Sequence, residues 1–162
     1  MDEKQKIEYE TAKDFLKLYN CKFGKSYAID GLSDAPDVKC KDEITGGKLN
    51  LEITLTEDRR GDIQAILGRS NSRDINVMIE NGLKSSCLQG EVSQILTQRI
   101  QKKLNKTYGK NTALIIRDTS GVPWDWNSVS NELKKSLDLS KNSFDKGIWI
   151  INRWGDKIFR IV

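Results

Sequence analysis

Two short stretches, Ala35-Pro36-Asp37-Val38-Lys39 and Asn50-Leu51-Glu52-Ile53-Thr54, decide how this chain is interpreted. In the first stretch, Asp37 stands at the start of a predicted strand. In the second, Glu52 lies on the polar face of the next strand, because apolar and polar residues alternate there. A Gly46-Gly47 turn joins the two strands into a hairpin. The hairpin therefore brings two carboxylates together.

The remaining sequence alternates between helical and extended patterns. The predicted elements are a helix at Lys4–Asn20, a short strand around Ser26–Ile29, strands at Asp37–Glu43 and Lys48–Thr56, a short helix at Asp62–Leu67, a helix at Glu91–Thr107, a strand at Ala113–Arg117, a helix at Trp126–Leu139, and a hairpin of Phe144–Ile151 with Lys157–Val162. This order predicts a single α/β domain over residues 1–162, with a central mixed β-sheet flanked by helices.

Composition narrows the chemistry that the chain can perform. The 162 residues include no histidine, which excludes Ser-His-Asp and Cys-His triads, histidine metal sites and HNH-type nucleases. Oxygen ligands must hold any metal, and they favour Mg²⁺ or Mn²⁺. The net charge of +4 is compatible with a polyanionic partner.

The sequence also predicts a cytoplasmic protein with no membrane partner. The first six residues are charged and lack the apolar stretch of a signal peptide, and no later run is apolar enough to span a bilayer. Cys21, Cys40 and Cys87 show no CxxC spacing, so neither a disulfide framework nor a zinc site is indicated.

The paired carboxylates are suited to a divalent metal that promotes phosphodiester hydrolysis. Asp37 and Glu52 would bind the metal, and the carbonyl of Ile53 would add a further oxygen ligand. At roughly 100° per residue, Glu8 falls on the apolar face of the first helix, whereas Glu10 faces solvent. Burial of a carboxylate is costly unless it is paired or metal-bound. Glu8 is thus a third candidate ligand, and the alternative is a salt bridge to Arg99 or Lys103.

Arg99 and Lys103 are unusual cations because both fall inside the buried arc of the Glu91–Thr107 helix. They are expected to reach a cleft, where they would contact substrate phosphate or pair with the acids. The alternative is that their long side chains extend from the rim of the core to solvent. Arg59 and Arg60, in a loop rich in charge, are candidates to grip a nucleic-acid backbone, and a solvated loop is the alternative.

With these features the chain resembles the PD-(D/E)XK nuclease superfamily, the restriction-endonuclease-like fold. The resemblance rests on Pro36-Asp37, on Leu51-Glu52-Ile53-Thr54, and on the order of the elements across nearly the whole chain. It implies that Asp37 and Glu52 bind the metal and that a first-helix glutamate, here Glu8, joins the site. It also implies a lysine two residues after Glu52, which positions the nucleophile and stabilises charge.

Thr54 occupies the position of that lysine. A hydroxyl supplies no positive charge and is a poor base near neutral pH. Some branches of the superfamily bring a replacement from another element. The candidates here are Lys39, Lys48, Arg99 and Lys103, and Lys103 or Lys39 is favoured.

The resulting expectation is a Mg²⁺- or Mn²⁺-dependent nuclease that acts on DNA in preference to RNA. Because many members of the superfamily dimerise to cut both strands, a homodimer is expected. The alternative is a catalytically inactive, nuclease-derived module that binds nucleic acid or protein, and Thr54 is its main support. An α/β domain with no nucleic-acid role is a third alternative, since the net charge is mild.

Overall fold

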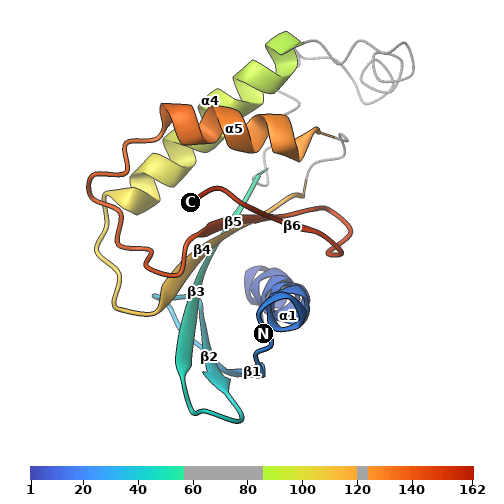
Figure 1. Ribbon diagram of the computed structural model, residues 1–162, viewed down its shortest axis with the longest axis vertical. Helices are drawn as coiled ribbons and strands as arrows, with labels where there is room; N and C mark the ends of the chain where they lie inside the picture. Colours follow the sequence, from blue (N-terminus) through green and yellow to red (C-terminus); the bar gives the residue numbers. More distant parts are fainter. Residues whose placement is uncertain (57–85, 120–123) are drawn as a thin grey trace.

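The computed structural model describes residues 1–56, 86–119 and 124–162, and it shows one mixed sheet between two helical layers (Figure 1). The described elements are α1 (Glu3–Phe23), β1 (Tyr27–Leu32), β2 (Val38–Asp42), β3 (Lys48–Leu55), α4 (Ser86–Leu104), β4 (Thr112–Arg117), α5 (Trp126–Ser136), β5 (Ile148–Ile151) and β6 (Ile158–Arg160). The single α/β domain with a central mixed sheet is therefore confirmed for this part of the chain.

The six strands lie in the order β1-β2-β3-β4-β5-β6. Strands β1, β2 and β3 form an antiparallel meander, β3, β4 and β5 are mutually parallel, and β6 returns antiparallel to β5. Helices α4 and α5 provide the crossovers between the parallel strands, as parallel pairing requires. Strands β3 and β4 thus sit in the middle of the sheet.

Two hydrophobic clusters cover the two faces of the sheet. Helix α1 packs on one face, where Phe15, Leu51 and Ile115 belong to one cluster. Helices α4 and α5 cover the other face, where the cluster includes Leu114 and Ile116. Figure 1 shows α1 on one side of the strands and the α4–α5 pair on the other. Strand β4 is buried over five consecutive positions, four of them apolar, because both of its faces are covered.

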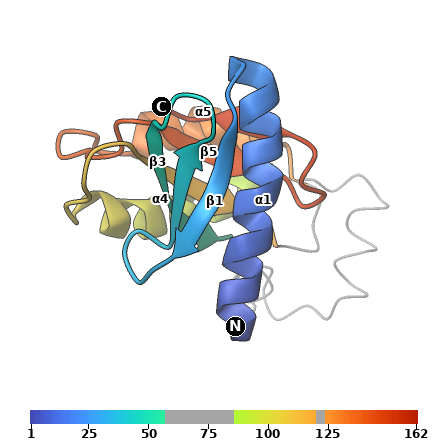
Figure 2. The same cartoon turned by 90° about the horizontal axis from the view of Figure 1, so that it is seen from below.

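Local sequence explains where α1 begins and ends. The Asp2 carboxylate accepts from the Gln5 backbone N–H at 2.7 Å, and the Gln5 side chain accepts from the Asp2 N–H at 3.1 Å. This reciprocal capping box satisfies two donors of the first turn. Gly24 ends the helix with a φ of 60°, a left-handed conformation that glycine adopts without a Cβ penalty. In Figure 2, α1 runs alongside β1.

The predicted elements agree with the observed ones in type, and they differ in extent. Strand β1 continues to Leu32, beyond the short strand expected around Ser26–Ile29, because it pairs along β2. Helix α4 begins at Ser86, before the expected Glu91. The terminal strands are shorter than expected. The predicted helix at Asp62–Leu67 lies outside the described residues.

Two tryptophans at the start of α5 contribute to the core. Trp126 is buried and donates through its indole Nε1 to Asp118 Oδ2 at 3.1 Å, while Trp124 packs against the α4–α5 cluster. These two side chains therefore take part in the core between the sheet and the α4–α5 pair. Among the helices that the structure describes, none has the length and apolarity needed to cross a membrane.

Candidate functional site

The two carboxylates of the hairpin meet where β2 begins beside β3. The last register pair of the two strands is Val38 with Leu51, so Asp37 falls opposite Glu52. Both are buried, with 5% and 4% of their surfaces exposed. Asp37 Oδ2 accepts from the backbone N–H of Ile53 at 2.7 Å, and so it takes the place of a strand partner. The Ile53 carbonyl points to the same side, because the N–H and C=O of one residue face the same neighbour.

Glu52 is held by two donors from α4 and the segment that follows it. Lys103 Nζ donates to Glu52 Oε1 at 2.6 Å, and the Tyr108 hydroxyl donates to the same oxygen at 3.2 Å. The other oxygen, Oε2, is buried and has no hydrogen-bond partner among the described residues. A buried carboxylate oxygen without a partner is costly. A cation at this oxygen would remove that cost.

The electrostatics of the pair follow from burial and from like charge. The pKa of Asp37 is raised from 3.8 to about 6, first by burial and then by the nearby charges of Glu52 and Glu8, while the Ile53 N–H and Lys103 oppose the increase. Burial and the charge of Glu52 also raise the pKa of Tyr108. Tyr108 therefore stays protonated at neutral pH and acts as a donor to Glu52.

Glu8 is buried, as the helical face predicted, and its observed partner is Lys4 at 3.1 Å on the same helix. Glu8 is thus paired within its own helix, whereas Lys103 pairs with Glu52. Glu8 raises the pKa of Asp37, so the two carboxylates lie within electrostatic reach. Across residues 1–56, 86–119 and 124–162, however, no three His, Cys, Asp or Glu side chains are grouped to hold one metal ion.

A strongly basic pocket lies beside the carboxylate pair, against the side of α4. It is open to solvent and has a volume of about 620 Å³. We call it the basic pocket; its lining residues are Thr54, Ile95, Gln98, Arg99, Lys102, Lys103 and Lys106. Arg99 is anchored there by an Nη1 hydrogen bond to the Leu55 carbonyl at 2.8 Å. Both core-facing cations of α4 therefore line this open pocket.

The candidates for the missing lysine are now separated in space. Lys103 forms an ion pair with Glu52. Thr54 lies two residues further along β3 and lines the basic pocket. Lys39 is exposed on β2 opposite Asn50, and Lys48 is exposed at the start of β3. Within the described residues, neither of these two lysines forms an ion pair with the acids. Arg59 and Arg60 lie outside the described residues, so their predicted role stays a prediction.

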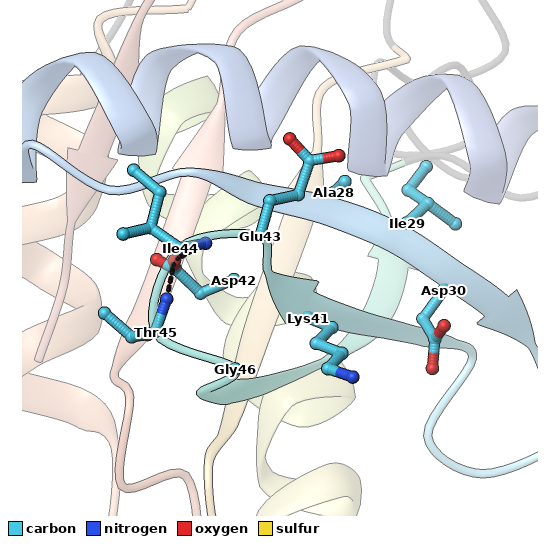
Figure 3. A pocket seen from close by; sticks show the side chains of 9 residues that line it. All are labelled: Ala28, Ile29, Asp30, Lys41, Asp42, Glu43, Ile44, Thr45 and Gly46. Atoms are coloured by element: carbon cyan, nitrogen blue, oxygen red, sulfur yellow. Dashed lines mark hydrogen bonds between the residues drawn. The ribbon is translucent and has the colours of Figure 1, made fainter.

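A second open pocket, of about 570 Å³, lies over the β1–β2 edge and the β2–β3 turn (Figure 3). Asp42 is the buried carboxylate in its lining; one of its oxygens is used by the turn and the other by the segment before β1. Oδ1 accepts from the N–H groups of Ile44 and Thr45, each at 2.9 Å, and Oδ2 accepts from Ser26 at 3.2 Å. Figure 3 shows the side chains of Asp30 and Glu43 pointing away from Asp42 and from each other. This carboxylate therefore builds the turn.

Tyr108 and Lys4 are the site residues that sequence reasoning missed. The partnership of Lys4 with Glu8 was visible in the i, i+4 spacing, which brings opposite charges together on a helix. Tyr108 carried no such signal. It lies 56 residues from Glu52 in the chain, and only the packing of α4 on β3 brings its hydroxyl to that carboxylate.

The resemblance to the PD-(D/E)XK superfamily is carried by residues that the structure brings together, namely Asp37, Glu52 and Ile53 on the hairpin. Lys103 belongs to α4, whereas the motif lysine would lie on β3 at the position of Thr54. Compared with family models, curated proteins and solved structures, the chain matches none of them. Membership of the superfamily therefore stays a prediction.

Proposed function

We propose that this protein is a Mg²⁺- or Mn²⁺-dependent nuclease of the PD-(D/E)XK type, with a restriction-endonuclease-like fold, which hydrolyses phosphodiester bonds in DNA in preference to RNA. One observation carries the proposal. Two buried carboxylates, Asp37 and Glu52, stand beside a lysine, Lys103, whose Nζ lies 2.6 Å from Glu52 and also lines an open basic pocket. Acids and a cation in this arrangement match the groups that the reaction needs.

The donor set suits a hard divalent cation. Asp37, Glu52 and the Ile53 carbonyl offer oxygen ligands only, which Mg²⁺ and Mn²⁺ prefer. The buried Oε2 of Glu52 has no hydrogen-bond partner within the described residues, so a ligand position is open on that carboxylate. When bound, the ion would supply Lewis acidity and a water molecule of lowered pKa. Glu8 lies within electrostatic reach of Asp37 and would act through water.

The neighbouring residues would position substrate and stabilise charge. Lys103 carries the positive charge that Thr54 lacks, and it would contact a phosphate oxygen on which charge develops. Tyr108 donates to Glu52 and fixes the orientation of that carboxylate. Arg99, anchored by the Leu55 carbonyl, would hold a phosphate of the same strand in the basic pocket. A homodimer that cuts both strands is part of the proposal.

Cleavage of labelled oligonucleotides tests the proposal directly. Single-stranded and duplex DNA and matching RNA are incubated with Mg²⁺, with Mn²⁺ and with chelator. We expect metal-dependent cleavage of DNA that Glu52→Gln abolishes. Glu43→Gln is the matched control, because Glu43 is an exposed glutamate on the same hairpin. Cleavage that survives Glu52→Gln undiminished would refute the assignment.

A binding module without catalysis is the second candidate, and two observations favour it. Lys103 already occupies Oε1 of Glu52, and the described residues contain no group of three metal-binding side chains. Such a module would use the basic pocket for a polyanion and would leave the carboxylates paired. Calorimetric titration with Mn²⁺ separates the two candidates. A nuclease binds Mn²⁺ with an affinity that Glu52→Gln removes, whereas a module binds oligonucleotide without binding the ion.

A further inference from the structure

The basic pocket follows one side of α4 for several turns. Its lining residues on the helix are spaced by three and four positions, the spacing that places side chains on one face. At 1.5 Å of rise per residue, the run from Ile95 to the end of the helix at Leu104 extends over roughly 14 Å, and Lys106 lies just beyond that end. A strand with its bases stacked as in a B-form helix rises about 3.4 Å per nucleotide, so this length corresponds to about four stacked nucleotides.

The cations of the pocket divide into two pairs with different surroundings. Arg99 and Lys103 are half-buried and are anchored by Leu55 and Glu52. Lys102 and Lys106 are exposed, and the carboxylate pair does not use them. No acidic residue stands among the described residues that line the pocket. The second pair therefore adds positive charge beyond what the chemistry at Glu52 requires.

The position of the basic pocket and its lining residues indicate which kind of ligand it would bind. Lys103 is shared between the pocket and Glu52, so a ligand in the pocket lies next to the reacting phosphodiester. The pocket is open to solvent, and its cations follow one side of a single helix, an arrangement that can track the backbone of one strand. Ile95 and Gln98 add one apolar and one amide side chain, which can contact exposed bases.

We propose, building on the nuclease function proposed above, that the basic pocket binds a single strand of polynucleotide next to the cleaved bond, with Lys102 and Lys106 contacting its flanking phosphates. The substrate class is then a nucleic acid with a single-stranded segment of about four nucleotides in the pocket, by the helix length above. The metal-binding acids take no part in this contact.

Equilibrium binding without metal tests the proposal independently of cleavage. The full-length protein is titrated, in chelator, into a fluorescently labelled single-stranded DNA of about twelve nucleotides, and anisotropy is measured at roughly 50 and 200 mM salt. Each phosphate contact with a single strand contributes about 0.7 to the salt slope. Removing two contacts with the double variant Lys102→Gln and Lys106→Gln should reduce the loss of affinity between these salt concentrations by about sevenfold.

A matched control comes from α5. Lys134 and Lys135 are exposed in its last turn, so Lys134→Gln with Lys135→Gln removes the same charge without touching the pocket. This control variant should keep the wild-type salt slope. An equal reduction in both double variants would show a non-specific charge effect and overturn the proposal.

The remaining outcomes are equally decisive. Failure of the wild-type protein to bind the single strand at low salt would overturn the proposal, as would equal competition by a blunt duplex or by a polyglutamate peptide of the same length. Binding that depends on Lys102 and Lys106, without cleavage in Mg²⁺, would support the pocket and refute the nuclease. Cleavage that both lysine substitutions leave unchanged would refute the pocket and keep the nuclease.

Discussion

The two ends of β2 each carry a buried aspartate, and the difference between them separates a structural carboxylate from a candidate functional one. Asp42 accepts backbone N–H groups on both oxygens, and those of Thr45 and Ile44 hold its pKa below the ordinary value. Asp37 accepts one backbone N–H and lies near two other acids, and its pKa is raised to about 6. The two aspartates therefore differ in how far backbone hydrogen bonds compensate them: at Asp37 burial and the charges of two neighbouring acids outweigh one hydrogen bond, whereas at Asp42 the hydrogen bonds prevail.

The largest expected difference between the two ends is in cleavage. Asp37→Asn should reduce metal-dependent cleavage by about a thousandfold or more, since even partners outside the ligand set cost roughly 10–100-fold. Asp42→Asn should leave the rate per folded molecule nearly unchanged, because its carboxylate serves the turn. Rates are measured with labelled DNA after circular dichroism has established the folded fraction. Comparable losses in both variants would remove the distinction between the two ends.

The pH dependence of stability should have opposite signs at the two ends. Because its pKa is raised, ionised Asp37 lowers the free energy of unfolding. This destabilisation is fully present above about pH 6 and is relieved as the pH falls toward 3.8. Asp37→Asn should therefore stabilise the protein at pH 8, by at most about 3 kcal/mol, and the gain should vanish near pH 4.

The lowered pKa of Asp42 has the opposite consequence. Its ionised form stabilises the fold above the ordinary value of 3.8, and this contribution is lost as the pH falls through the lower folded value. Asp42→Asn should thus lower the urea midpoint at pH 8 and lose its effect in acid. Urea unfolding of both variants in chelator, from pH 4 to pH 8, measures the two slopes. Parallel slopes would contradict the comparison.

The Lys103 side chain should affect both cleavage and metal binding at the Asp37 end of β2. Lys103→Met should reduce cleavage by about a hundredfold, because a charge that stabilises the transition state is lost. The same change should raise Mn²⁺ affinity by at least about fivefold, since the lysine competes with the ion for Glu52. Kinetics and calorimetric titration give the two readouts. Lys39→Met, on exposed β2, is the control and should change neither.

The smallest expected effect concerns the Tyr108 hydroxyl. Tyr108→Phe removes one hydrogen bond to Glu52 and should cost about 1 kcal/mol of unfolding free energy. Cleavage should fall only severalfold, because Lys103 still holds the same oxygen. Tyr9→Phe, on the half-buried side of α1, controls for loss of a hydroxyl. A loss as large as that of Lys103→Met would give Tyr108 a direct part in the chemistry.

The hairpin and the helix α1 show how far local patterns reach. Alternation along β3 and the turn glycines predict a hairpin that brings Asp37 and Glu52 together, and the observed register places these two residues opposite each other. Helical spacing likewise put Glu8 on the buried face of α1. The extent of β1 could not be predicted, because its length depends on pairing along β2. Residues 57–85 and 120–123 are outside this comparison.

The sequence by itself determined the elements, the pair of carboxylates and the absence of imidazole chemistry, because these depend on residue type and on spacing within one element. The tertiary structure alone decided which cation stands at Glu52, since Lys103 lies 51 residues away in the chain. It also decided that Tyr108 donates to the same oxygen, and that four cations of α4 and its end line one pocket. Contacts between distant segments follow from how helices pack on a sheet, and no local pattern records that packing.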